Sequence, residues 1–72
     1  MKFLAKNIKY LRLKKGLSQE QFAEELMVTR ARICSYECTK TKPSIKFLFH
    51  LSNYSNMSMD RILKENLNKL EL

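Results

Sequence analysis

Two helix starts follow one another closely in this chain, and their spacing restricts the possible folds more than any other feature. In the run LSQEQFAEELMVT, Ser18 can cap a helix, and Gln21, three residues later, completes a capping box. Thr29 is a second residue of a type that caps helix starts. The sequence therefore predicts a short helix over residues 19–26, a tight turn, and a separate third helix over residues 29–37.

Apolar residues at helical spacing, together with residues that favour helix ends, divide the remaining chain into three further helices. No alternation of the kind that marks strands, and no internal repeat, occurs in the 72 residues. The chain is therefore predicted to be a single all-α domain. The further helices are expected over residues 3–14, ended by Gly16, over residues 43–54, ended by Asn56, and over residues 58–71, capped by Ser58.

Size and charge exclude several functional classes. A chain of 72 residues buries only about 60% of the surface that its unfolded form exposes, which leaves little core for a deep catalytic pocket. The formal net charge of +7 should attract polyanions, so nucleic acid and anionic membrane are the natural partners. No apolar stretch reaches the roughly 18 to 20 residues that span a bilayer, and the first residues lack a signal-peptide core. We therefore expect a cytoplasmic protein.

The two cysteines, Cys34 and Cys38, are expected to be free thiols. Their spacing on a helix brings the Cα atoms near disulfide range without good Cβ geometry. A structural zinc site usually takes four ligands, whereas the chain offers two cysteines and His50. A nucleophile with a nearby histidine and acid, or a loop that cradles phosphate, cannot be assembled either. We therefore expect no metal, no cofactor and no enzymatic activity.

The predicted third helix carries arginines on both sides of its outward face. With Ile33 as the inward residue and about 100° of turn per residue, Ala31 and Ser35 point outward. Arg30 and Arg32 then lie on opposite flanks of this face. A major groove about 12 Å wide admits such a helix, and the planar fork of arginine matches two acceptors of guanine. The alternative is a charged face that is merely solvated.

Basic residues also gather around this helix. The loop TKTK supplies Lys40 and Lys42, which are well placed to contact phosphates. Residues 28–46 hold five lysines and arginines against the single acid Glu37. This local excess of positive charge favours a helix that reads DNA over one that is only solvated.

Two runs, LSQEQFAEELMVTRARICSYE and KPSIKFLFHLSNYSNMSMDRIL, resemble the lambda-repressor and Cro-like, or XRE-type, helix-turn-helix family. The resemblance covers about residues 7–64. It implies a compact five-helix domain in which helices 2 and 3 form the helix-turn-helix and the third helix enters the major groove of double-stranded DNA. The positions that fall at the family's spacing are Ser18, Gln19, Phe22, Ala23, Leu26, Val28, Thr29, Ile33, Glu37, Pro43 and Ser44.

The resemblance also assigns roles to individual residues. Matched by position, one group of residues on the third helix faces DNA bases, and a second group around it contacts phosphates. The residues implied to face bases are Arg30, Ala31, Arg32 and Ser35. The residues implied to contact phosphates are Gln19, Thr29, Lys40, Lys42 and Ser44.

Arg12 lies on the apolar face of the first helix, where an unpaired charge is costly. Glu37, the acid on the inner side of the third helix, is its candidate partner, and family members similarly pair a basic residue with the matching glutamate. Such a structural ion pair would fix the angle of the third helix. The alternative is a surface bond between Glu37 and Arg30.

Two positions depart from the family pattern. The family favours glycine in the turn between helices 2 and 3 and again just after the third helix, where this chain has Met27 and Thr39. If these residues are left-handed, each substitution costs on the order of 1 kcal/mol or more. We therefore expect a less stable fold or slightly altered turns.

Apolar residues exceed what five short helices readily bury. Phe47 falls where related proteins usually carry a polar residue, so it either packs under the C-terminal helix or forms part of a subunit interface. The other candidates for this surface are Tyr54, Leu67 and Leu70, and the C-terminal helix 58–71 is a candidate dimer contact. A symmetric homodimer would bury this surface and read inverted half-sites about 34 to 36 Å apart.

The leading interpretation is a sequence-specific transcriptional regulator that binds double-stranded DNA, most simply a small repressor that reads an inverted-repeat operator. The alternative is a protein-interaction module, such as the antitoxin or partner-binding member of a pair, that works through the apolar surface. Binding to a membrane surface is least favoured, because the basic residues are spread over several short helices.

Overall fold

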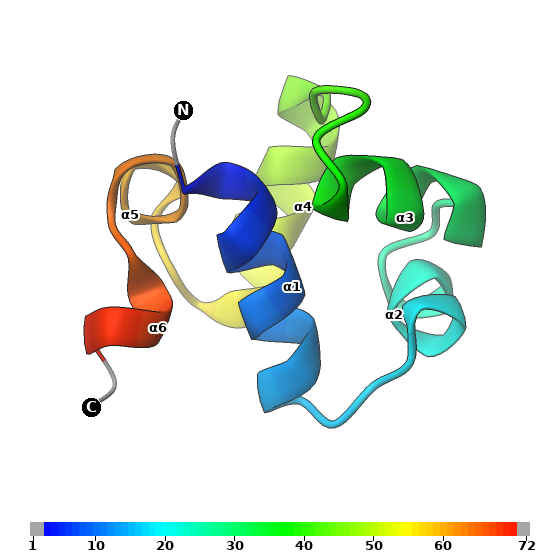
Figure 1. The fold of residues 1–72 in the computed structure, drawn as a ribbon, viewed down its shortest axis with the longest axis horizontal. Coiled ribbons are helices and arrows are strands. Elements are labelled where there is room, and N and C mark those ends of the chain that lie inside the picture. Colours follow the sequence, from blue (N-terminus) through cyan, green and yellow to red (C-terminus); the bar gives the residue numbers. More distant parts are fainter. Residues whose placement is uncertain (1–2, 71–72) are drawn as a thin grey trace.

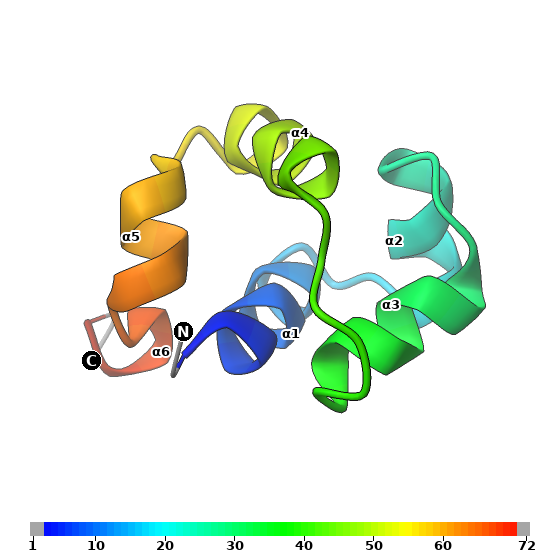
Figure 2. The same cartoon turned by 90° about the horizontal axis from the view of Figure 1, so that it is seen from above.

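The computed structural model describes residues 3–70, with side chains through residue 68, and contains no strand within them. The helices are α1 (Leu4–Lys14), α2 (Gln19–Glu25), α3 (Arg30–Glu37), α4 (Ile45–Ser55), α5 (Met59–Lys64) and α6 (Leu67–Leu70). Figure 1 shows their order, and Figure 2 shows α2 and α3 at one end of the molecule, α5 and α6 at the other, and α1 and α4 between them. The all-α prediction is confirmed.

The helix starts follow the local signals of the sequence. Ser18 Oγ accepts a hydrogen bond from the backbone N–H of Gln21 at 3.1 Å, and Gln21 Oε1 accepts one from the backbone N–H of Ser18 at 2.9 Å. Thr29 Oγ1 accepts from the backbone N–H of Arg32 at 3.2 Å. Because α2 and α3 each begin at their own N-cap, they form two separate short helices, as predicted.

The core draws on all six helices. Its fully buried side chains include Ile8, Phe22, Ile33, Leu51 and Ile62. Helix α1 contacts α3, α5 and α6, while α2 contacts α3 and α4 contacts α5. This packing holds one face of α3 against the core and leaves the other face exposed. None of the helices within residues 3–70 has the length and apolarity that a membrane span requires.

The structure shows Phe47 and Leu67, two candidates for a dimer surface, buried in the core, so of the two alternatives for Phe47 packing within the domain is the one observed. Phe47 is 3% exposed, and its ring packs on that of Tyr36 in α3, with ring centroids 4.8 Å apart. Leu67 is 2% exposed. Periodicity within α4 could not show that α3 supplies an aromatic partner for Phe47. Neither residue can contact another protein unless the core opens.

The exposed apolar surface of α4 consists instead of Ile45 and Phe49, which are 78% and 55% exposed and lie one helical turn apart. We call these two residues the α4 stripe. Tyr54 is half-buried, because its ring packs edge-on against Phe22 with centroids 5.9 Å apart. The side chain of Leu70 lies outside the described residues.

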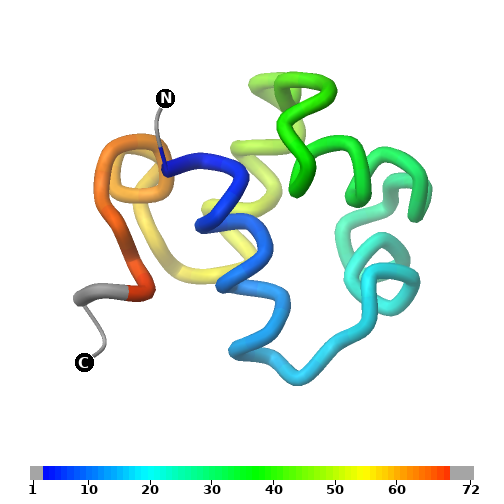
Figure 3. The backbone as a smooth tube through the Cα atoms, viewed as in Figure 1, coloured from blue at the N-terminus to red at the C-terminus, as the bar shows by residue number. Residues whose placement is uncertain are grey.

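The predicted C-terminal helix over residues 58–71 is interrupted between α5 and α6, where Glu65 is extended, with φ −96° and ψ 147°. The buried side chain of Asn7 holds this interruption: its Nδ2 donates to the carbonyls of Ile62 and Glu65, both at 2.7 Å. Its Oδ1 accepts from the backbone N–H of Leu67 at 3.2 Å. These bonds replace those that a continuous helix makes within itself. Figure 3 shows how the chain changes direction near its C-terminal end. Leu67, the first residue of α6, lies in the core.

Both residues that replace the family's glycines are left-handed. Met27 has φ 58° and Thr39 has φ 62°. An L side chain in this conformation crowds its own backbone, at a cost of about 1 to 2 kcal/mol. Packing does not offset this cost, because Met27 is 80% exposed and Thr39 is also exposed. The two turns that border α3 therefore store strain.

We expect Met27→Gly and Thr39→Gly each to raise the free energy of unfolding by roughly 0.5 to 1 kcal/mol, because glycine relieves the strain but loses more backbone entropy on folding. In a domain of this size, a gain of about 1 kcal/mol raises Tm by about 4 to 8 °C. Thermal unfolding followed by circular dichroism measures the change. Met27→Ala is the matched control, because it keeps the Cβ atom. An equal gain in the alanine variant would show that strain is not the cause.

Candidate nucleic-acid interface

Helix α3 is anchored by its inner face and presents its first turn to solvent. Ile33 is fully buried and Tyr36 is 4% exposed, so these two side chains fix the helix to the core. Arg30, Ala31 and Arg32 are all exposed. The N-terminal turn of α3 therefore projects from the molecule with an arginine on each side of a small residue.

An open groove of about 420 Å³ lies between α3 and the segment that follows it. Three residues expected to face bases line this groove, namely Ala31, Arg32 and Ser35. Lys42 and Ser44, two of the expected phosphate contacts, line it as well. The fold thus brings residues of α3 and of the following loop onto one surface, which is suited to a polyanion that lies along α3.

The other expected contacts, Gln19, Thr29, Arg30 and Lys40, do not line this groove. Arg30 and Lys40 are exposed, and Arg30 occupies the flank of α3 opposite Arg32. Thr29 caps α3 through its hydroxyl oxygen, and a hydroxyl in this role still has a hydrogen to donate. Sequence reasoning missed Thr41, which also lines the groove. The position of Thr41 between Lys40 and Lys42 was the feature of the sequence that could have indicated it.

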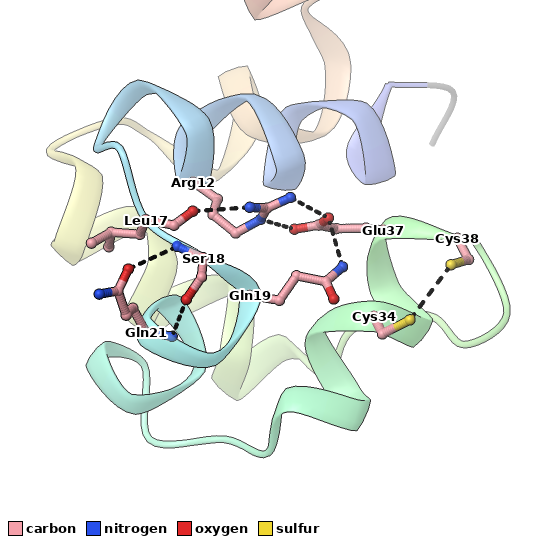
Figure 4. Close-up of polar contacts among 8 residues, drawn as sticks. All are labelled: Arg12, Leu17, Ser18, Gln19, Gln21, Cys34, Glu37 and Cys38. Carbon is pink, nitrogen blue, oxygen red and sulfur yellow. Dashed lines mark hydrogen bonds and ion pairs between the residues drawn. The ribbon is translucent and has the colours of Figure 1, made fainter.

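A buried ion pair joins α3 to α1. Arg12 Nε donates to Glu37 Oε2 at 2.7 Å, and Arg12 Nη2 donates to Glu37 Oε1 at 3.1 Å, so the pair is bidentate. Arg12 Nη1 also donates to the carbonyl of Leu17 at 2.9 Å. The side chains of Arg12 and Glu37 are 10% and 4% exposed. Figure 4 shows that this cluster connects α1, the segment before α2, and the end of α3.

Gln19, expected to hold a phosphate, also takes part in this cluster. Its Nε2 donates to Glu37 Oε1 at 3.2 Å (Figure 4). The bond links the first residue of α2 to the last residue of α3, so Glu37 helps to set how the two helices meet. An amide nitrogen carries two hydrogens, which leaves one for a phosphate. Sequence reasoning missed this bond, because spacing along a helix does not indicate contacts between helices.

Comparison with known proteins gives consistent matches. The sequence model of the family described as Helix-turn-helix matches residues 8–62. Uncharacterized HTH-type transcriptional regulator YqaE of Bacillus subtilis (strain 168) is 34% identical over 65 residues, which make up 90% of this chain and 56% of that protein. SPbeta prophage-derived uncharacterized HTH-type transcriptional regulator YonR of the same organism is 40% identical over 57 residues, or 79% of this chain and 53% of that protein.

HTH-type transcriptional activator BcrR of Enterococcus faecalis is 36% identical over 56 residues, which make up 78% of this chain and 28% of that protein. No solved structure gave a significant match. The chain spans about half the length of the first two relatives. The matched residues 8–62 include α2, α3 and the groove, and the match supports the prediction that the domain is not an enzyme. The chain belongs to the helix-turn-helix family, with the lambda-repressor-like fold that its sequence predicts and with α2 and α3 as its helix-turn-helix.

Proposed function

We propose that this domain binds double-stranded DNA and regulates transcription, with α3 lying in the major groove. The observation that carries the proposal is the groove beside α3, where an exposed arginine, small residues and a lysine meet on one surface. Membership of the helix-turn-helix family supports it, as do the names of the three relatives, each described as a transcriptional regulator or activator. The net charge of +7 supplies the attraction to a polyanion.

Base readout belongs, in this proposal, to the first turns of α3. Arg32 has a planar fork of donors that matches the O6 and N7 acceptors of guanine. Arg30, on the opposite flank, can reach a neighbouring base pair. Ala31 and Ser35 are small, so they allow the helix to approach the base edges closely.

Phosphate contacts belong to the surrounding residues. Lys40 and Lys42 lie in the exposed loop after α3 and supply mobile positive charge. Thr29 and Ser44 are the N-caps of α3 and α4, where backbone N–H groups and the helix dipole favour an anion. Gln19 completes this set from the start of α2.

We expect Lys40→Ala and Lys42→Ala to weaken binding to all duplexes alike and to reduce the slope of log K against log salt by about 0.9 for each phosphate contact that is lost. Fluorescence anisotropy of a labelled random-sequence duplex, titrated at several salt concentrations, measures both effects. The control is Lys64→Ala, because Lys64 lies in α5 at the other end of the molecule and pairs with Asp60. An equal loss in this control would contradict the proposed phosphate contacts.

The finer proposal is a homodimeric repressor that reads an inverted repeat. A two-fold dimer places two copies of α3 about 34 to 36 Å apart, which is one turn of DNA, and simultaneous binding raises affinity. The α4 stripe is exposed apolar surface that a second copy can cover. We expect Phe49→Ser to reduce dimer formation in sedimentation experiments.

Because one relative is named an activator, a promoter-reporter assay must establish the direction of regulation, and we expect repression.

The α4 stripe also supports the second candidate function, a protein-interaction module. Such a module still binds its protein partner when the DNA-facing arginines are replaced, and it no longer binds this partner when Phe49 is replaced. If the domain reads DNA as a dimer, its affinity for the preferred duplex falls in both variants. Comparing Arg32→Ala with Phe49→Ser therefore separates the two functions.

A further inference from the structure

The two cysteines lie beside the proposed DNA-reading face, and the proposed DNA contacts use neither of them. The sulfur atoms of Cys34 and Cys38 are 3.9 Å apart, and both side chains are exposed (Figure 4). Arg30, Cys34 and Cys38 follow one another at four-residue steps, so they lie along one flank of α3. The thiol pair therefore occupies the same side of the helix as one of the arginines expected to face bases.

Two exposed thiols this close together offer two soft donors to a single ion. The hydrogen bond between them raises the pKa of Cys38, and the charge of Lys40 acts in the opposite direction. Soft thiolate ligands select soft cations, and a cation of sufficient affinity displaces both protons. The two exposed sulfur atoms, 3.9 Å apart, can both reach one thiophilic ion, and no neighbouring acid is required as a ligand.

The surroundings restrict which ion fits. Both carboxylate oxygens of Glu37, the nearest acid along the chain, accept hydrogen bonds from Arg12 or Gln19. No group of three or more His, Cys, Asp or Glu side chains within the described part of the chain is arranged to hold a metal ion. Tetrahedral zinc and hard divalent cations require more ligands than this pair supplies. A soft monovalent cation such as Cu(I) or Ag(I), by contrast, is satisfied by two thiolates.

We propose that Cys34 and Cys38 form a two-thiolate site for a soft monovalent cation of the Cu(I) and Ag(I) class, and that occupation of this site weakens DNA binding by α3. The second half of the proposal rests on the proposed function. Linear coordination requires the sulfur atoms to separate slightly beyond 3.9 Å, which rotation of two exposed side chains provides. Cys34 lies in the second half of α3 and Cys38 is its C-cap, so this adjustment of the two side chains leaves the first turn of the helix intact.

The expected effect on DNA binding follows from the charge balance. Each thiol releases one proton to solvent while the cation brings one positive charge, so the local charge falls by one unit when the site is filled. The filled site is an anionic bis-thiolate on the flank of α3 that carries Arg30. Negative charge at this position repels the phosphate backbone and opposes the attraction that the lysines and arginines provide.

The test uses Ag(I) as a redox-inert probe on the reduced full chain. Native mass spectrometry and calorimetric titration are compared for the wild type, Cys34→Ser, Cys38→Ser and the double serine variant. We expect the wild type to bind one Ag(I) with the loss of two protons, and each single variant and the double variant to lose this tight binding. Equal Ag(I) binding by the double variant, which retains the methionines and His50, would overturn the site. A complex of two chains bridged by one Ag(I) would overturn it as well.

A second readout tests the effect on DNA. We expect Ag(I) to weaken the binding of the wild type to its preferred duplex several-fold and to leave the double serine variant unchanged. If Ag(I) binds as expected but DNA affinity does not change, the proposed effect on DNA binding is wrong, whereas the proposed two-thiolate ion site is supported. If the ion-free wild type binds no duplex, the proposed function fails, whereas the mass spectrum still decides the ion site on its own.

Discussion

Glu37→Ala is expected to lower the free energy of unfolding by about 3 to 5 kcal/mol, because it leaves the buried guanidinium of Arg12 without its partner. The substitution also removes the acceptor that holds Gln19. The total stability of a small domain is only about 5 to 15 kcal/mol, so this one change removes a large part of it. Urea unfolding followed by circular dichroism measures the loss.

Two controls separate the buried pair from an ordinary surface charge. Lys64→Ala breaks the exposed pair with Asp60, in which the side chains are 74% and 71% exposed, and we expect a loss below about 1 kcal/mol. The double variant Arg12→Met with Glu37→Leu removes both charges, so we expect it to recover much of the stability lost in Glu37→Ala. A loss in Glu37→Ala no larger than that in Lys64→Ala would contradict the role of the pair in positioning α3.

The second large effect concerns DNA recognition. Arg32→Ala is expected to raise Kd for the preferred duplex by about 5- to 150-fold, which corresponds to about 1 to 3 kcal/mol, and to relax the base preference at one position of the site. Arg30→Ala is expected to have an effect of the same size at a different position. Competition between the preferred duplex and single-base variants of it measures both the loss and the change in preference.

The distinction between a base contact and a phosphate contact requires its own comparison. Arg32→Lys keeps the charge but loses the planar fork, so we expect it to bind all duplexes while discriminating poorly between them. Arg61→Ala in α5 is the remote control, since Arg61 pairs with Glu65 and not with the groove. If Arg32→Ala weakens binding equally on every sequence, the residue contacts phosphate and the proposed base readout is wrong.

Local chemistry determined the parts of the fold that could be predicted. Ser18 and Thr29 cap their helices because a side-chain oxygen satisfies a backbone N–H a few residues away. Asn56 is left-handed, at φ 54°, at the position where it was expected to end the fourth helix. In each case the partners are near neighbours in the sequence, so the residue type and its spacing contain the necessary information.

Long-range contacts account for the parts that could not be predicted. Asn7 interrupts the C-terminal helix through a bond to Leu67, a residue 60 positions away in the sequence. Likewise, Phe47 is buried because α3 supplies Tyr36, which no pattern within α4 indicates. The same distinction applies to the candidate site. Helical periodicity predicted the exposed face of α3, whereas the groove also depends on where the loop with Thr41 and Lys42 packs.

The central claim is that α3 reads the base sequence of double-stranded DNA. Selection of bound duplexes from a random-sequence library, at near-physiological salt and with reduced protein, tests it most directly. We expect enrichment of one defined site, arranged as an inverted repeat with half-sites about one helical turn apart, and loss of that enrichment with Arg30→Ala and Arg32→Ala combined. Recovery of duplexes with no shared sequence, or an identical site from the double variant, would contradict the claim.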